Sequence, residues 1–268
     1  MSFCFCPLRS GSSGNALFVQ AGRARVLVDA GLSGKRIECA LGEIGVAPET
    51  LTGIIVSHEH SDHIQGAGVL SRRYDLPLYA TKGTWRAMAE LPTIQRVADK
   101  NRREFGAGDD FYIRDLAIAP FAIPHDAAEP VGFALLHAGR KICIATDLGH
   151  IAPGWMQALR GADLVLLEAN HDPDKLRDST RYNARLKSRI LGRHGHLSNG
   201  DCGQALVQLA QSGVRRAILG HMSEETNTPE LAFTTVSAAL QEAGVRPSDM
   251  RVDLAYRDKT GGLYEVGE

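Results

Sequence analysis

The densest group of potential metal ligands in the chain is the segment His-Glu-His-Ser-Asp-His at residues 58–63. It follows an apolar run, residues 53–57, that is typical of a buried strand. Imidazole and carboxylate groups together suit zinc, manganese and iron. Packing alone does not explain so many imidazoles, because each buried ring needs a polar partner. Alternate residues of a tight loop can converge on one point while their neighbours turn toward a second, so the segment indicates two adjacent metal ions.

Three more residues of the ligand type stand where predicted strands end. His125, Asp147 and His221 each follow an apolar run of four to eight residues. One such residue could be only the polar end of a strand. Three of them, in the same chain as the 58–63 segment, predict a shared site to which several strands contribute.

The order of the predicted elements indicates an α/β fold (α+β in some schemes). Short strands alternate with helices in both halves of the chain, and the stretch between residues 104 and 146 is rich in strands. Two β-rich halves with helices outside favour a four-layer αββα sandwich around one continuous core. Residues 1–268 are expected to form a single domain with an irregular, basic segment at about 171–194. The last two strands, 252–256 and 262–266, are expected to pair with each other.

The composition is that of an ordinary globular protein, with 44% hydrophobic and 23% charged residues, which excludes a disordered or collagen-like chain. No apolar run approaches the ~20 residues of a membrane-spanning helix. The start of the chain lacks the features of a secretory signal. The five cysteines are scattered and odd in number, which indicates reduced thiols. We therefore expect a cytoplasmic protein without a membrane partner, and the sequence leaves the oligomeric state open.

Positive and negative charges nearly cancel, with 30 Lys and Arg against 31 Asp and Glu. Any contact with nucleic acid must therefore come from a local patch. Between residues 177 and 193 there are six basic residues and one acid. Arg181, Arg185 and Arg189 are spaced by four, so on a helix they would form one stripe. We expect Arg181 and Arg185 to bind a nucleic-acid backbone. The alternative is a solvated surface paired with acids elsewhere in the fold.

In chain order, the 58–63 segment, His125, Asp147 and His221 resemble the motifs of the metallo-β-lactamase-fold hydrolases. Asp29 in the sequence Leu-Val-Asp-Ala-Gly resembles the first motif of that family. The resemblance covers nearly the whole chain. It implies two metal sites, one formed by His58, His60 and His125 and the other by Asp62, His63 and His221. Asp147 would bridge the two ions together with a hydroxide, and Asp62 would also take part in catalysis. Asp62, and Asp147 in place of a Cys, favour the dinuclear branch over the zinc lactamases.

Further segments indicate which branch of this family the chain resembles. Those that resemble the tRNase Z group are Glu168-Ala169-Asn170, Gly195-His196-Leu197-Ser198 and residues 219–223. The match is partial, because Asn170 replaces a Thr and no inserted tRNA-binding arm is found. Residues 10–16 and 168–172 are closer to the YycJ/WalJ branch, bacterial proteins described as DNA exonuclease-like. The resemblance implies that His196 donates a proton to the leaving alkoxide, with Glu168 holding its ring in place.

We therefore expect a hydrolase with two divalent ions (zinc, manganese or iron) that cleaves phosphodiester bonds, as a DNA exonuclease does, by attack of the bridging hydroxide. The Gly- and Ser-rich segment at residues 10–15 offers donors to a phosphate, with Ser13 and Asn15 as candidate contacts. A tight hairpin loop would have the same composition.

Two other functions are considered. One is a small-molecule metallohydrolase acting on a thioester, a lactone or a cyclic phosphodiester, and the other is a binding protein that has kept the fold. The complete ligand set argues against the binding protein. An acid at His196 favours phosphate esters, because their alkoxide leaving groups need a proton most.

Overall fold

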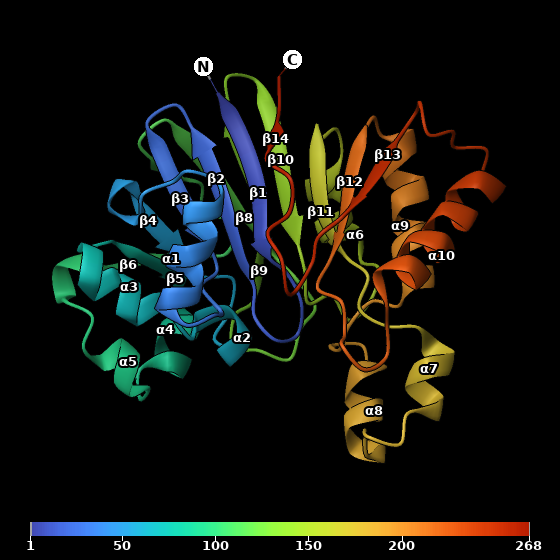
Figure 1. Ribbon diagram of the computed structural model, residues 1–268, viewed down its shortest axis with the longest axis horizontal. Helices are drawn as coiled ribbons and strands as arrows, with labels where there is room; N and C mark the ends of the chain where they lie inside the picture. Colours follow the sequence, from blue (N-terminus) through green and yellow to red (C-terminus); the bar gives the residue numbers. More distant parts are fainter. Residues whose placement is uncertain (1, 268) are drawn as a thin grey trace.

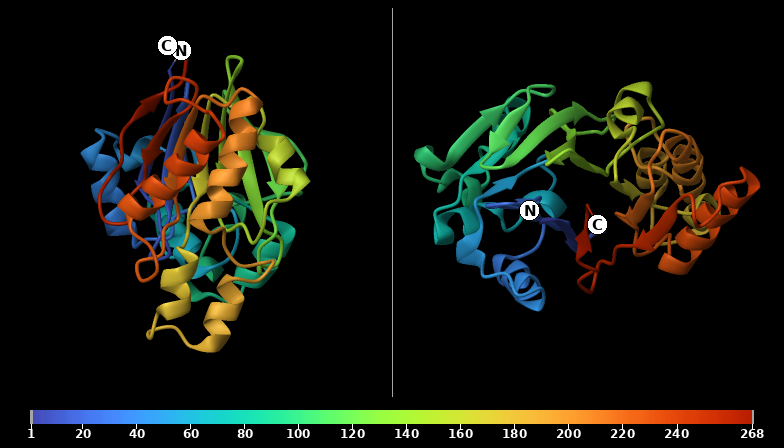
Figure 2. Two further views of the ribbon diagram at one scale, coloured as in Figure 1. Left: turned by 90° about the vertical axis from the view of Figure 1, so that its right-hand side faces the viewer. Right: turned by 90° about the horizontal axis from the view of Figure 1, so that it is seen from above.

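The computed structural model describes residues 2–267 and consists of two seven-stranded sheets packed face to face (Figure 1). Helices cover the outer surface of each sheet, which is clear when the molecule is seen from the side and from above (Figure 2). The α/β class and the four-layer αββα sandwich are thereby confirmed.

The first sheet joins an antiparallel part to a parallel part. In spatial order its strands are β14 (Tyr264–Glu265), β1 (Phe3–Arg9), β2 (Ala16–Ala21), β3 (Ala24–Val28), β4 (Gly53–Ile55), β5 (Leu78–Thr81) and β6 (Arg102–Phe105). Strands β1 to β3 are antiparallel, and β4 to β6 continue from β3 in parallel. Side chains alternate along β1, so Phe3 and Phe5 face the second sheet while Cys6 and Leu8 face the helices.

The second sheet has the same mixed character. In spatial order its strands are β13 (Arg251–Leu254), β12 (Arg216–Gly220), β11 (Leu164–Glu168), β10 (Arg140–Ala145), β9 (Val131–His137), β8 (Leu116–Ala122) and β7 (Phe111–Ile113). Strands β10 to β13 are parallel. The expectation that the last two strands pair with each other is wrong. β13 extends the parallel part beside β12, and the chain then crosses to the first sheet, where β14 pairs with β1.

The helices fall into three groups. Against the first sheet lie α1 (Gly34–Glu43), α3 (Ala67–Tyr74), α4 (Lys82–Met88) and α5 (Pro92–Gln95), with α2 (Ser61–Ile64) at one end of the sandwich. Against the second sheet lie α6 (Pro153–Leu159), α9 (Asn199–Gln211) and α10 (Pro229–Glu242). Short 3₁₀ turns cover Pro48–Thr50 and Asp99–Asn101. Among residues 2–267, no helix combines the length and the apolar character that crossing a membrane requires.

A pair of short helices, α7 (Pro173–Asp178) and α8 (Ala184–Ile190), projects beyond the end of the sandwich (Figure 1). We call residues 172–191 the α7–α8 lobe. The expectation of an irregular segment at 171–194 is therefore wrong in part. Local capping explains the two helices, because the side chains of Asp172 and Asn183 accept hydrogen bonds from the first backbone N–H groups of α7 and α8.

The hydrophobic core consists of three clusters rather than the single continuous one that was expected. The central cluster fills the space between the sheets and includes Phe5, Phe133 and Leu166. Each outer cluster lies between one sheet and its helices. A sheet buried on both faces separates apolar side chains into distinct layers, which divides the core in this way.

The two ends of the sandwich differ. The first and last strands lie side by side at one end, where β14 pairs with β1, and both termini are drawn there (Figure 1). Helix α2 and the α7–α8 lobe lie at the opposite end. The predicted ligand residues all belong to segments at this second end.

Backbone hydrogen bonds tie three loops together at that end. Asn15 N–H donates to the Asp62 carbonyl (2.8 Å), Ala30 N–H to the His63 carbonyl (2.7 Å) and Gly31 N–H to the Asn15 carbonyl (2.7 Å). The approach is so close that a Cβ atom on Gly31 would lie 1.6 Å from the Asp62 carbonyl oxygen. Only glycine fits at position 31, so this residue sets how tightly the 58–63 segment is held.

We predict that Gly31→Ala lowers the free energy of unfolding by about 3 kcal/mol or more, because the new methyl group overlaps backbone that cannot move aside. Urea denaturation followed by circular dichroism measures the change. The matched control is Gly42→Ala in α1, where an added Cβ meets no atom within 4 Å. This control should stabilise the protein by up to about 1 kcal/mol. Equal stabilities for the two variants would contradict the prediction.

Candidate metal centre

Side chains from four strand ends converge at the lobe end of the sandwich. They follow β4, β8, β10 and β12, whose last residues lie at the same edge of the two sheets. The structure brings together all seven predicted ligands, namely His58, His60, Asp62, His63, His125, Asp147 and His221. Their nitrogen and oxygen atoms form overlapping groups whose members all lie within 4.8 Å of one another.

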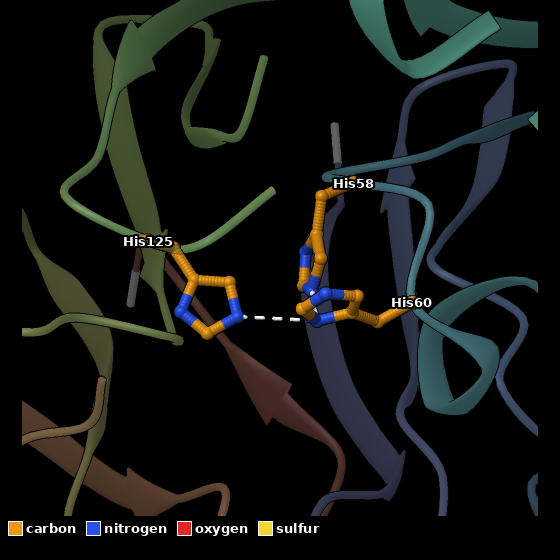
Figure 3. Close-up of side chains that lie close together, drawn as sticks. All are labelled: His58, His60 and His125. Atoms are coloured by element: carbon orange, nitrogen blue, oxygen red, sulfur yellow. Dashed lines mark hydrogen bonds between the residues drawn. The ribbon is translucent and has the colours of Figure 1, made fainter. Parts of the chain in front are cut away.

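One group consists of three imidazoles that face a common point (Figure 3). His60 Nδ1 lies 3.1 Å from His58 Nε2 and 3.2 Å from His125 Nε2. A neutral imidazole has one N–H and one lone pair, so the three facing nitrogens cannot all be satisfied by one another. A divalent cation between them would satisfy all three, because neutral imidazole is a common metal ligand.

The second group consists of Asp62, His63 and His221. Asp62 Oδ2 lies 3.5 Å from Nε2 of both His63 and His221. Asp147 lies between the two groups: its Oδ2 is 3.3 Å from His63 Nε2, and its Oδ1 is 3.6 Å from His125 Nε2. This arrangement places one carboxylate within reach of both sets of imidazoles.

Asp147 also provides the test of whether a cation fits. It is 2% exposed, and within the part of the chain that the structure describes its Oδ2 has no hydrogen-bond partner. Buried polar atoms without a partner are rare in folded proteins, because each costs the free energy of desolvation. This oxygen, which His63 Nε2 approaches at 3.3 Å without forming a hydrogen bond, and the facing imidazole nitrogens are the donor set of a divalent metal site, so the residues fit such an ion.

The electrostatics of the site follow from its burial and its mixed charges. Burial alone would raise the pKa of Asp147, but the surrounding imidazoles, His221 foremost, hold it well below its ordinary value. Burial also lowers the pKa of His58 and of His125, which favours neutral rings with a free lone pair. The pKa of His221 is raised to about 10, because Asp147, Asp62 and Glu168 outweigh the effect of burial. A bound cation takes the place of such protons.

Partners behind the ligands fix their orientation. His63 Nδ1 lies 2.8 Å from Asp29 Oδ2, and Asp29 also accepts hydrogen bonds from the backbone and side chain of Ser57. His125 Nδ1 lies 3.2 Å from the Gly195 carbonyl. With Nδ1 occupied, each ring presents Nε2 to the centre, as ligand histidines do in known metal sites.

The backbone at three of these positions adopts the left-handed conformation. The φ angles are 61° for Asp29, 61° for Asp147 and 52° for His221. Each residue stands one or two positions after a strand ends. Left-handed conformations are uncommon outside glycine, and such strain concentrates at functional sites. Here the sharp turn directs the side chain back across the ends of the sheets.

Glu168, the last residue of β11, connects the centre to His196. Its Oε1 lies 2.8 Å from Nδ1 of both His196 and His221, and its Oε2 accepts hydrogen bonds from the backbone N–H groups of Leu148 and Leu197. Burial would raise the pKa of Glu168, but His196 and His221 lower it to about 2. The carboxylate is therefore charged and fully engaged. Glu168 and His196 also lie within ligand distance of Asp147 and His221, so the geometry alone allows His196 to be a ligand or a proton donor.

A cleft of about 310 Å³ opens over the centre. It is lined by Asp62, Asp147, His196 and His221, by Ser12 and by the lobe residues Tyr182, Leu186 and Arg189. The centre is therefore accessible to a substrate from solvent. The side chain of His196 is 16% exposed, whereas that of Glu168 is fully buried.

The structure places the predicted substrate contacts differently from the expectation. Ser12, not Ser13, lines the cleft. Asn15 is buried, and its amide N–H groups donate to the carbonyls of Gly11 (3.2 Å) and Asp62 (3.3 Å), so it supports the ligand loop. The pattern in residues 10–15 does not show which hydroxyl faces the centre, because that depends on how the loop packs against β12.

The expected arginine stripe is wrong. Helix α8 begins after its cap at Asn183, so Arg181 lies outside the helix and pairs with Glu225 (2.9 Å). Arg185 is exposed and does not line the cleft. Arg189 does line it, together with Asn170 and with Tyr182, a residue that the sequence pattern did not single out. The cap at Asn183 was the available signal, since it fixes which positions share a helix face.

Comparisons with known proteins agree with this architecture. Residues 24–222 match the model of the beta-lactamase superfamily domain. The chain is 39% identical to exodeoxyribonuclease WalJ of Streptococcus pneumoniae strain D39 over 243 residues, which is 91% of this chain and 90% of that protein. It is 39% identical to exodeoxyribonuclease YycJ of Bacillus anthracis over 244 residues, which is 91% of each chain.

A crystal structure of the metallo-beta-lactamase fold protein YhfI from Bacillus subtilis superposes with a TM-score of 0.72. It has 15% sequence identity and covers 99% of this chain and 100% of its own, so it supports the fold alone. The match to the domain model and the identity to WalJ and YycJ extend over most of the chain. The protein therefore belongs to the metallo-β-lactamase superfamily, in the same branch as WalJ and YycJ.

Proposed function

We propose that the chain is a metal-dependent phosphodiesterase that degrades DNA from a strand end, with residues 1–268 acting as one catalytic domain. The observation that carries this proposal is the Glu168–His196 pair next to the His and Asp centre, with His196 lining an open cleft. Hydrolysis of a phosphodiester needs an acid for the leaving alkoxide, and this pair can supply it. The names of WalJ and YycJ, both exodeoxyribonucleases, support DNA as the substrate.

We assign the ligands of two divalent ions, zinc, manganese or iron. His58, His60 and His125 would hold the first, and Asp62, His63 and His221 the second, with Asp147 shared between them. Such ions, when bound, neutralise charge on the phosphate and lower the pKa of the attacking water. The short distances from Asp147 to both groups of imidazoles support the shared role.

The protein's own residues would orient the substrate and move protons. Glu168 engages His196 at Nδ1, which leaves Nε2 as the nitrogen that can give a proton to the leaving oxygen. Ser12 can donate a hydrogen bond to a phosphate in the cleft. Asp29 and Ser57 would keep His63 in the orientation that a ligand needs.

The proposal is tested with purified protein supplied with manganese or zinc. Substrates are an end-labelled linear DNA, a circular single-stranded DNA, a small phosphodiester and a thioester. We expect shortening of linear DNA from an end and an intact circle. Cleavage of the circle at a similar rate would reject the exonuclease assignment. Hydrolysis of the thioester without any phosphodiester activity would replace the proposal with a small-molecule hydrolase.

Removing the shared carboxylate should damage the centre most. We predict that Asp147→Ala lowers turnover by well over ~100-fold and reduces the metal content per chain, because the two groups of imidazoles lose the ligand between them. Metal analysis by mass spectrometry is read beside activity. Asp110→Ala, which changes an exposed aspartate before β7, should alter neither. A variant at Asp147 that kept full metal content and near-normal turnover would contradict the assignment.

A variant at His196 separates a proton donor from a ligand. We predict that His196→Ala keeps its metal content but loses roughly 10²–10⁴ in rate on DNA, the usual size of general-acid catalysis. The defect should shrink on a nitrophenyl phosphodiester, whose leaving group departs without a proton. The matched control is His194→Ala, an exposed histidine two residues away.

Two results would speak against His196 as the acid. An equal loss on activated and unactivated esters would remove the need for a proton from this residue. Loss of metal in His196→Ala would make His196 a ligand, which the distances to Asp147 and Glu168 also allow.

A further inference from the structure

We propose that Arg189 binds a backbone phosphate of the substrate strand next to the bond that is cut, with Asp126 holding its guanidinium group ready. This inference rests on the proposed function, since it names how the cleft recognises a polymer. It assigns the phosphate contact, which the sequence predicted for the exposed Arg181 and Arg185, to a residue that lines the cleft.

The position of Arg189 is the first support. Among the cleft-lining residues in the described part of the chain, it is the one Lys or Arg. Its side chain is 47% exposed, so the guanidinium group is open to a ligand. It shares the cleft with Asp62, Asp147 and His196, and the charges of Asp62 and Asp147 add to that of Asp126 in raising the pKa of Arg189. The positively charged Arg189 side chain therefore lies close enough to the centre to interact with its carboxylates.

The ion pair with Asp126 orients the guanidinium group of Arg189 and leaves some of its N–H donors free. Nε and Nη2 of Arg189 lie 2.5 and 3.0 Å from the two carboxylate oxygens of Asp126. A guanidinium group has five N–H donors, so three remain for a phosphate. Its planar fork matches the oxygens of a phosphate better than a point charge does. The substrate need not displace Asp126 in order to bind.

Because Asp126 is the neighbour of the ligand His125 in the chain, the contact with Arg189 lies beside the metal centre rather than within it. Asp126 follows His125, and its Oδ1 lies 3.5 Å from His125 Nε2. Asp126 belongs to neither group of ligand atoms around Asp147. A phosphate held by Arg189 is therefore a neighbour of the scissile phosphate. We expect a small substrate with a single phosphate to bind at the centre without this contact.

Lobe residues on the same wall suit the rest of a nucleotide. Leu186 lies three residues before Arg189 on α8, so the two share a helix face. Tyr182 also lines the cleft, and its hydroxyl lies 3.3 Å from Ser223 Oγ, which ties the lobe to the loop after β12. An aromatic ring and an aliphatic side chain beside a cation form a surface on which a base or sugar can pack.

The alternative is that the ion pair only holds α8 against the loop that carries His125. Both roles predict that loss of Arg189 matters, so the test compares a polymer with a small substrate. It also compares Arg189 with its partner Asp126. Arg177→Ala serves as the control for lost charge, because Arg177 is an exposed lobe residue paired with Asp174 and lies outside the cleft.

Kinetics are measured for Arg189→Ala, Arg189→Lys and Arg177→Ala on a single-stranded oligonucleotide and on bis(4-nitrophenyl) phosphate. In Arg189→Ala we expect KM for the oligonucleotide to rise by ~10-fold or more, with kcat/KM for the small ester within ~2-fold of the original protein. Arg189→Lys should fall between, and Arg177→Ala should match the original protein. The slope of log affinity against log salt should become shallower by ~0.7 when the phosphate contact is lost. Affinity is read by fluorescence anisotropy in the slow His196→Ala background.

Asp126→Asn completes the design, with metal content measured in every variant. If Arg189 binds phosphate, this change affects KM for the oligonucleotide much less than Arg189→Ala does, because the guanidinium group keeps its charge and the Asn oxygen still accepts one of its hydrogen bonds. If the pair is only structural, Asp126→Asn and Arg189→Ala raise KM for both substrates and lower the melting temperature alike, which would overturn the proposal. A wild-type KM and salt slope in Arg189→Ala would overturn it too. The proposed function fails separately, when the unmodified protein does not degrade DNA at all.

Discussion

The structure depends on one buried carboxylate, that of Asp147, surrounded by imidazoles. An isolated charge at such depth would be prohibitive, and the histidines around it outweigh the effect of burial, since they hold the pKa of Asp147 well below its ordinary value. The same constraint explains why His63, His125 and His221 each have a second partner on the far side of the ring. The fold therefore concentrates polar residues around Asp147, where each side chain fixes the orientation of its neighbour.

The layered fold makes this concentration possible. Parallel strands in both sheets end at one edge, and the apolar clusters between the layers keep those ends in register. Left-handed residues after three strands then turn Asp29, Asp147 and His221 across the edge. The rigid strands fix the positions of the loops, and the loops carry the ligand residues, as is usual in enzymes whose sites lie on loops.

Much of this could be predicted from the sequence, because imidazole and carboxylate groups at strand ends leave a chemical pattern that packing does not explain. The alternation of strands and helices likewise predicted the layers. The partner of the last strand could not be predicted, since an apolar run does not specify which sheet edge it joins. The expected stripe of Arg181, Arg185 and Arg189 is wrong for a related reason, as it depends on the residue at which α8 begins.

The pairing of β1 with β14 places both ends of the described chain together, away from the cleft (Figure 1). A fluorophore, an affinity handle or a solid support attached at either end would therefore leave the catalytic face turned toward solution. Immobilised protein could then act on a long polymer without the surface blocking its approach. The same geometry would let two copies be joined in tandem with both clefts open.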